Sequence, residues 1–142
     1  PSNTKISSPT QVGTNTTWKS GRVGENNMTA TKTDGTLWMW GANQAGNLGL
    51  NQGYPGIAAA SSPVQVGTDT TWDKIAAGGA FTQALKTDGT LWIWGHNETG
   101  QLGQNEGPGG NAGSLSSPTQ IPGTWSKIDS SSKHGFALQS TS

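Results

Sequence analysis

The carboxylates best placed for chemistry belong to two Asp-Gly pairs, Asp34-Gly35 and Asp88-Gly89, each inside a Thr-Asp-Gly-Thr segment. A carboxylate could bind calcium or act as a general base, but both roles need further oxygens or a second acid at a regular spacing. Neither pair has such neighbours. Asp-Gly between extended segments is a strong hairpin signal, because glycine readily adopts the positive φ of a tight primed turn. We therefore predict turns here.

The other candidates for catalysis or metal binding are weaker. The two histidines, His96 and His134, stand at non-equivalent positions, and the chain has no cysteine. Neither a shared imidazole site nor a thiolate site is therefore indicated. The sequence has no nucleophile elbow, phosphate-binding loop or Ser-His-Asp arrangement. We predict a protein without enzymatic activity, bound metal or cofactor.

Seven tryptophans stand out among the apolar residues. Exposed rings could stack on sugars, whereas buried rings would form the core of a sheet protein. All seven stand at equivalent positions of an internal repeat, which favours the core. Tyr54, in an irregular segment, is a better candidate for a binding contact.

The internal repeat covers most of the chain. Residues 7–50 align without a gap on residues 61–104, with about 25 of 44 positions identical. The most similar segments are Thr33–Gly49 and Thr87–Gly103. A third copy begins at Ser116 and continues to Leu138, where it stops before its Asp-Gly turn. A period of this length is typical of propeller blades or solenoid units, so the sequence holds two complete units and part of a third.

The segment Leu37-Trp38-Met39-Trp40 shows how these units must pack. Successive side chains of a strand point to opposite faces, so Leu37 and Met39 lie on one face and the two tryptophans on the other. Both faces are apolar, and the same holds for residues 91–94. Such a strand needs cover on both sides, as in stacked sheets or the blades of a propeller.

Four short antiparallel strands are predicted in each unit, which is the pattern of a propeller blade. The first strand of the first unit departs from the pattern of its counterpart around Gly21, so this unit is expected to be the less tightly packed one. Long loops are expected at residues 51–60 and 105–114, on one face of the assembly. The predicted strands are residues 18–23, 28–32, 37–40 and 63–66 in the first unit and 72–77, 81–86, 91–94 and 118–121 in the second.

Two consecutive motifs resemble the regulator-of-chromosome-condensation repeat. They are Gly-Gly-x-Phe-Thr-x-Ala-Leu at Gly78–Leu85 and Asp-Gly-Thr-Leu-Trp-x-Trp-Gly-x-Asn-x-x-Gly-Gln-Leu-Gly at Asp88–Gly103. The resemblance covers nearly the whole chain and implies four-stranded blades of a β-propeller, commonly about seven in a closed ring. The sequence Lys-Thr-Asp-Gly-Thr-Leu-Trp is most similar to repeats of bacterial secreted and bacteriophage virion proteins. A position that is commonly His in the family is Asn27, Phe81 and His134 in the three units.

These patterns predict blade boundaries and a core. We expect an N-terminal edge strand and linker at residues 1–16, blade 1 at 17–67, blade 2 at 68–122 and a partial blade 3 at 123–142. The predicted blade core is Trp18, Leu37, Trp38, Trp40, Trp72, Ile75, Leu85, Leu91, Trp92, Trp94, Trp125 and Ile128.

Composition excludes several classes of partner. The formal net charge is zero and only 11% of residues are charged, so the chain lacks the basic surface of a nucleic-acid-binding protein. No apolar run approaches the roughly 18 residues of a transmembrane helix, and we expect no membrane insertion. The hydrophobic share of 30% leans toward disorder. Low charge, many aromatics and strict repetition argue instead for a folded chain.

Both ends of the chain carry unfinished blades, and unpaired strand edges are either covered or used for association. We expect head-to-tail association, in which the N-terminal segment of one copy adds a strand beside residues 134–139 of the next. Such a contact gives a ring if the rotation closes and a fibre if it does not. The predicted assembly interface is Pro9, Gln11, Val12, His134, Phe136 and Leu138.

The leading functional prediction is therefore a structural subunit of an extracellular or virion appendage. The first alternative is a binding module that presents loops 51–60 and 105–114 to a protein or a glycan. The second is an exchange-factor-like regulator, which the short chain and the lack of a charged face disfavour. Three Asn-x-Ser/Thr triplets, at Asn15, Asn27 and Asn97, match the acceptor pattern for glycosylation.

Overall fold

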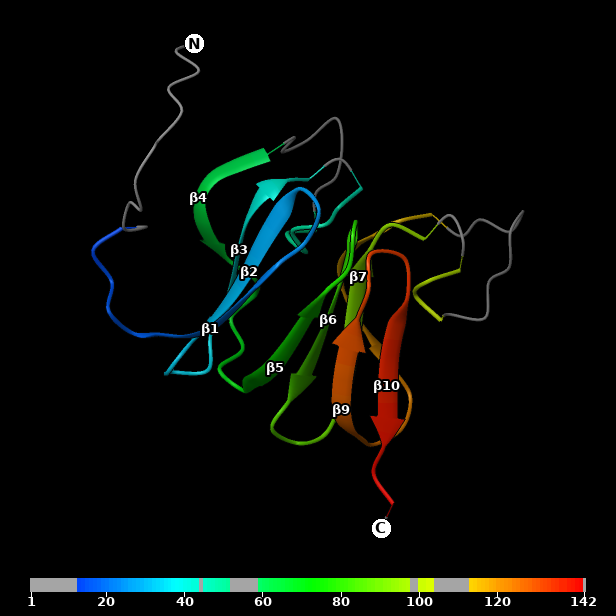
Figure 1. Cartoon of the computed structure of the whole chain (residues 1–142). Helices are drawn as coiled ribbons and strands as arrows, with labels where there is room; N and C mark the ends of the chain where they lie inside the picture. Colours follow the sequence, from blue (N-terminus) through cyan, green and yellow to red (C-terminus); the bar gives the residue numbers. More distant parts are fainter. Residues whose placement is uncertain (1–12, 44, 52–58, 98–99, 104–112, 142) are drawn as a thin grey trace.

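The computed structural model describes residues 13–43, 45–51, 59–97, 100–103 and 113–141, and the regular structure in them is all β-strand (Figure 1). Two antiparallel sheets have four strands each in chain order, and a third has two. This arrangement confirms the predicted all-β fold of two complete blades and a partial third. Blade 1 is β1 (Trp18–Val23), β2 (Asn27–Lys32), β3 (Leu37–Ala42) and β4 (Ala59–Gln65); blade 2 is β5 (Trp72–Ala77), β6 (Phe81–Lys86), β7 (Leu91–Gly95) and β8 (Leu115–Ile121); blade 3 is β9 (Trp125–Ser130) and β10 (Gly135–Gln139).

The Asp-Gly hairpins form where predicted, but their turn type differs. Gly35 has a φ of 80°, whereas Asp34 does not have a positive φ, and the Gly35 amide donates to the Lys32 carbonyl at 3.0 Å. The loop thus has three residues with one left-handed glycine, and not the primed two-residue turn. The Asp34 side chain explains the change, because its Oδ1 accepts from the amide of Thr36 at 3.0 Å and holds the loop open by one residue.

The fourth strands begin earlier than predicted. β4 starts at Ala59 and β8 at Leu115, so Pro63 and Pro118 lie inside strands, and residues 59–60 of the first predicted loop belong to the sheet. Proline is tolerated there because each strand is at the edge of its sheet, where the missing N–H has no ladder partner. Register irregularities beside Gly41 and Gly95 accompany this pairing.

The first strand of blade 1 is complete, contrary to the expectation of a degraded strand. β1 pairs with β2 through the same irregularity after its tryptophan, between Trp18 and Ser20, as β5 shows between Trp72 and Lys74. Gly21 pairs with Ala30 as Ile75 pairs with Ala84. Backbone pairing therefore fixes the strand, and its side chains differ from those of β5 mainly in being more exposed.

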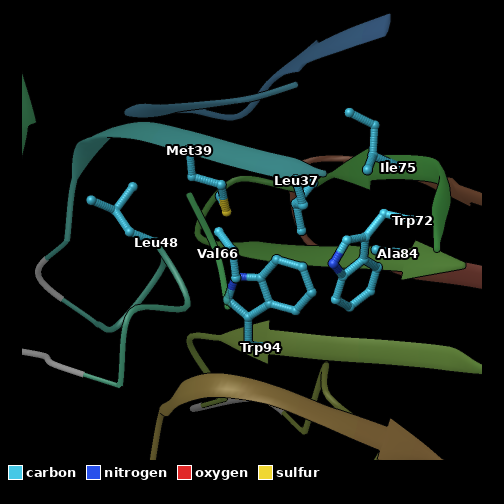
Figure 2. Close-up of a cluster of buried hydrophobic side chains, with 8 residues drawn as sticks. All are labelled: Leu37, Met39, Leu48, Val66, Trp72, Ile75, Ala84 and Trp94. Carbon is cyan, nitrogen blue, oxygen red and sulfur yellow. The ribbon is translucent and has the colours of Figure 1, made fainter. Parts of the chain in front are cut away.

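The main core lies between the two complete blades, where β5 packs against β1 and β2. Figure 2 shows the side chains of the two blades facing each other across this space. Burial of such side chains contributes roughly 1.5–3 kcal/mol each. The buried residues are Leu37, Met39, Leu48 and Val66 from blade 1 and the segment after it, and Trp72, Ile75, Ala84 and Trp94 from blade 2.

A smaller core lies on the opposite face of blade 2. Phe81, Ile93 and Leu102 are buried there, with Leu115 and Ile121 packed against them. β9 lies against β5 and β6, so blade 3 sits on the far side of blade 2 from blade 1 (Figure 1). Blade 2 is therefore covered on both faces, whereas blade 1 is covered by described residues on one.

The hairpin glycines give a test of the contact between blades. A side chain at Gly35 would overlap the carbonyl oxygen of Thr70 and would require a left-handed backbone, whereas Gly67 has a φ of 64° with open space around it. We expect Gly67→Ala to lower the free energy of unfolding by about 1 kcal/mol through backbone strain alone. Gly35→Ala should cost about 1–3 kcal/mol more, because the overlap forces the blades apart.

Urea denaturation of both variants under dilute conditions measures this difference. Equal losses at the two glycines would contradict the close approach of the Thr70 segment to the first hairpin.

Candidate functional site

Three tryptophans gather on one face of blade 1. The Trp18 ring lies 6.2 Å from that of Trp38 in an edge-on arrangement and 6.1 Å from that of Trp40. The Lys32 ammonium lies 4.8 Å from the centre of the Trp18 ring and 3.7 Å from that of Trp38. Cation–π attraction of this kind contributes about 0.5–2 kcal/mol and fixes the rings relative to one another.

Blade 2 repeats the same cluster. The Trp72 ring lies 6.2 Å from those of both Trp92 and Trp94, and the Lys86 ammonium lies 4.7 Å from the Trp72 ring and 4.1 Å from the Trp92 ring. Lys86 also pairs with the Asp69 carboxylate at 2.7 Å. The recurrence shows that the cluster belongs to the repeat itself.

The hairpin carboxylates support these rings. Asp34 Oδ1 accepts from the Thr36 hydroxyl at 2.6 Å, and that hydroxyl accepts from Trp38 Nε1 at 2.8 Å. Asp88, Thr90 and Trp92 form the same relay. The hydrogen bond from the threonine side chain, followed by that from its amide, holds the pKa of each carboxyl below its ordinary value.

These carboxylates therefore position the tryptophan rings through the threonine hydroxyls. Among the described residues no group of three or more acidic, histidine or cysteine side chains could hold a metal ion. The part of the chain that the structure describes also contains no helix long and apolar enough to cross a bilayer.

The two tryptophan clusters differ in their surroundings. Trp72 and Trp94 are buried against blade 1, and Trp94 Nε1 donates to the main-chain carbonyl of Asn47 at 3.0 Å. Trp18 and Trp40 are only half-buried, and no described residue accepts from the Trp40 indole. Blade 1 thus presents outward the same face that blade 2 buries inside the chain.

Further apolar side chains extend this open face of blade 1. Val23 pairs with Met28 across β1 and β2, and Met28 pairs with Trp40 across β2 and β3. Residues paired across antiparallel strands share a face, so the three form a row, with Val23 70% and Met28 39% exposed. We call the set Trp18, Val23, Met28, Trp38 and Trp40 the open face.

The other end of the chain has an unfinished sheet. β10 pairs with β9 alone among the described strands, whereas its counterpart β6 pairs with both β5 and β7. Phe136 and Leu138 of β10 are each 61% exposed. His134, the third predicted interface residue here, is exposed and lies just before β10, where its carbonyl accepts from the Ser131 amide at 2.8 Å.

The remaining predicted residues fall into three groups. Pro9, Gln11 and Val12 lie outside the described residues. Six of the twelve residues predicted for the blade core are buried and six are half-buried, the latter mainly on the open face and in blade 3. The buried six are Leu37, Trp72, Ile75, Leu85, Leu91 and Trp94; the half-buried six are Trp18, Trp38, Trp40, Trp92, Trp125 and Ile128.

Two of the three glycosylation predictions are wrong. Asn27 is buried in β2, and Asn97 is buried with its Oδ1 accepting from the Leu102 amide at 3.0 Å. An oligosaccharide needs an exposed amide nitrogen, so the folded chain cannot carry one at either position. Asn15 is exposed and accepts from the Thr17 amide at 3.0 Å, and its glycosylation stays a prediction.

Sequence reasoning missed the lysines between the rings and the apolar row at Val23 and Met28. The lysines had a signal, since Lys32 and Lys86 precede the Thr-Asp-Gly-Thr turn in both complete units. The apolar row had none of comparable strength, because the counterparts in blade 2 are Ala77 and Thr82.

Comparison with known proteins fits this geometry. The family model for the regulator of chromosome condensation (RCC1) repeat matches residues 34–85 and 88–138, well over half of the chain, and a second model for the same repeat matches residues 72–101. The chain belongs to the RCC1-repeat family. Each match to the first model begins in the Asp-Gly turn before a third strand and ends within the second strand of the next blade, so one sequence repeat joins two blades.

Individual relatives share only part of their length with this RCC1-repeat chain. The human probable E3 ubiquitin-protein ligase HERC3 is 39% identical over 75 residues, which is 51% of this chain and 7% of that protein. The mitochondrial RCC1 domain-containing protein RUG3 of Arabidopsis thaliana is 38% identical over 72 residues, or 51% of this chain and 16% of that protein. The structure of yeast RCC1 (Prp20) bound to Kap60 superposes with a TM-score of 0.74 and 24% identity, over 86% of this chain and 30% of that one.

The hydrogen bond from the Trp94 indole to the Asn47 carbonyl distinguishes the buried tryptophan cluster of blade 2 from the open cluster of blade 1. Trp94→Phe removes the bond to Asn47 and part of the packing between blades, so the free energy of unfolding should fall by about 2–4 kcal/mol. Trp40→Phe is the matched control at the equivalent position and should cost less than about 1 kcal/mol in dilute solution, since its ring is half-buried. Chemical denaturation at low protein concentration measures both, and a larger loss for Trp40→Phe would contradict the assignment of the open face.

Proposed function

We propose that this chain is a non-enzymatic structural repeat protein whose copies assemble head to tail, so that each open end is covered by the next copy. The observation that carries the proposal is the difference between the two tryptophan clusters. Trp72 and Trp94 are buried by a neighbouring blade, whereas Trp18 and Trp40 have the same arrangement with no neighbouring blade among the described residues. A second copy placed against blade 1 would remove this difference.

The other end of the chain supplies a matching surface. Phe136 and Leu138 lie on the face of β10 that points away from blade 2, because their neighbour Ala137 pairs with Ile128, the counterpart of Ile75 in the core. The open face and the β10 face therefore point in opposite directions along the row of blades (Figure 1). Contact between them is heterologous and propagates, giving a ring or a fibre according to the rotation per copy.

The strand order inside the blades shapes this junction. In both complete blades the second strand lies between the first and the third. The fourth strand, which contains Ser-Ser-Pro, pairs with the third and forms the edge of the sheet. The segment around Pro9–Val12 carries the same Ser-Ser-Pro motif as the fourth strands. Placing it directly beside β10, a second strand, would therefore depart from the strand order of the other blades. We therefore base the assembly on stacking of blade faces, with strand addition as a secondary contact.

The proposed setting is an extracellular or virion appendage. Its support is the resemblance, predicted from the sequence alone, of the repeat motifs to those of secreted bacterial and virion proteins. A low share of charged residues, 11%, also suits a scaffold with extensive subunit contacts.

The mass of the protein in solution tests the proposal. A single copy has a mass of 14.6 kDa. Light scattering coupled to size exclusion should show species several times larger at micromolar concentrations, and electron micrographs should show rings or fibres. A folded species that keeps the mass of one copy at every concentration would rule out the assembly.

A second candidate function is glycan binding. A cleft of about 390 Å³ lies beside the predicted first loop and is lined by residues that include Trp92, Asn51, Gln65 and Asp69. A half-buried aromatic face with amide and carboxylate groups around it is suited to a sugar ring. Most of loops 51–60 and 105–114 lies outside the described residues.

A glycan array separates this candidate from pure assembly. Binding that Trp92→Ala abolishes and Trp38→Ala retains would establish the cleft as a sugar site. The second variant is the matched control, because Trp38 holds the equivalent position in blade 1. Absence of any glycan signal from the assembled protein would exclude the candidate.

A further inference from the structure

We propose that copies join by a size-complementary contact, in which Phe136 and Leu138 of one copy fill the space above Gly21 of the next. This inference rests on the proposed head-to-tail assembly and names the residues of its junction. It follows from comparing the interface between blades 1 and 2 with the two blade faces that no described residue covers.

The interface between blades 1 and 2 is the template. There β5 packs against β2, and the residues of β2 on the side of blade 2, Thr29 and Thr31, are small and buried. The facing strand β5 contributes the larger Ile75, which is also buried. At this interface small side chains on the second strand are thus matched by a large one on the first strand of the next blade, whereas between blades 2 and 3 the equivalent residues of β6 are Gln83 and Leu85.

The open ends have the sizes reversed. Phe136 and Leu138 occupy in β10 the positions of Thr29 and Thr31 in β2, since the pairs Leu138–Lys127 and Thr31–Ser20 stand at the same place in their sheets. Gly21 occupies in β1 the position of Ile75 in β5, since they pair with Ala30 and Ala84. Stacking β10 of one copy on β1 of the next therefore sets two large side chains against a glycine.

No contact among the described residues requires glycine at position 21. Its φ lies outside the left-handed region, and an added Cβ would meet only the Thr29 carbonyl oxygen, at an ordinary 3.6 Å. Glycine weakens a strand interior and commonly marks a place where another chain approaches closely. The exposed Phe136 and Leu138, each 61% accessible, provide the approaching surface.

Backbone hydrogen bonds set the register of the stack. The Glu25 amide donates to the Gly79 carbonyl at 3.1 Å, and the Gly79 amide donates to the Ser132 carbonyl at 2.8 Å. The three residues are equivalent, one per blade. If the same pattern continues between copies, the Ser132 amide of one copy donates to the Glu25 carbonyl of the next. This hydrogen bond places β10 of the first copy over β1 of the second.

Cysteine cross-linking tests the contact, because the chain has no cysteine of its own. The double variant Gly21→Cys with Phe136→Cys should form, on mild oxidation, a ladder of disulfide-linked multimers, since the two positions lie on opposite sides of the molecule. Each single variant should give at most a weak dimer. A double variant that yields no ladder beyond the dimer, while the unmodified protein assembles, overturns the inference.

A size swap gives an independent test. Gly21→Ile should raise the dissociation constant of assembly at least tenfold without changing the circular dichroism of the dilute protein. Combining it with Phe136→Ala should restore much of the lost affinity, because the removed ring makes room for the new side chain. Assembly unaffected by Gly21→Ile would overturn this contact and leave the proposed function standing, whereas a monomeric unmodified protein would overturn both.

Discussion

A sheet with large apolar side chains on both faces must be covered on both sides, and this constraint governs the whole chain. Leu37 and Met39 of β3 are covered by blade 2, while the tryptophans on the other face of the same strand are half exposed. Apolar area left in water costs roughly 25 cal/mol for each Å² that a neighbour could have covered. The constraint is met at the centre of the structure, whereas no described blade covers the outer face of blade 1, where we propose the contact between copies.

The repeat period predicted the blades well, because each blade packs against its neighbour through residues at the same repeat positions. The strands followed from turn signals that recur in each unit, and the two-faced third strand followed from the alternation of large apolar residues in Leu37–Trp40. Local polar interactions were predicted less well. The Asp34 side chain adds a residue to the hairpin loop, and the Asn97 amide caps a buried bend instead of facing solvent. The same side chains recur in both units, but their spacing in the sequence does not reveal which backbone groups they bond.

Exposure was the least predictable property. Trp40 and Trp94 are equivalent in sequence, yet one is half-buried and the other is fully buried with its indole bonded to Asn47. The difference comes from position along the row of blades, which a repeat by definition does not encode. For the same reason the segment around Gly21 was interpreted as a weakened strand. Its backbone pairing is intact, and the missing side chain of Gly21 leaves space on the open face.

Membership of the RCC1-repeat family fixes the architecture, and the relatives show the repeat inside much longer proteins. The central claim is that the Trp40 face is covered in the working state of this chain. Hydrogen exchange of the tryptophan indole N–H groups, followed by nuclear magnetic resonance as the protein is concentrated, tests it most directly. We predict that the Trp94 indole is protected at all concentrations and that the Trp40 indole becomes protected only on assembly. A Trp40 indole that exchanges equally fast in dilute and concentrated protein would contradict the account.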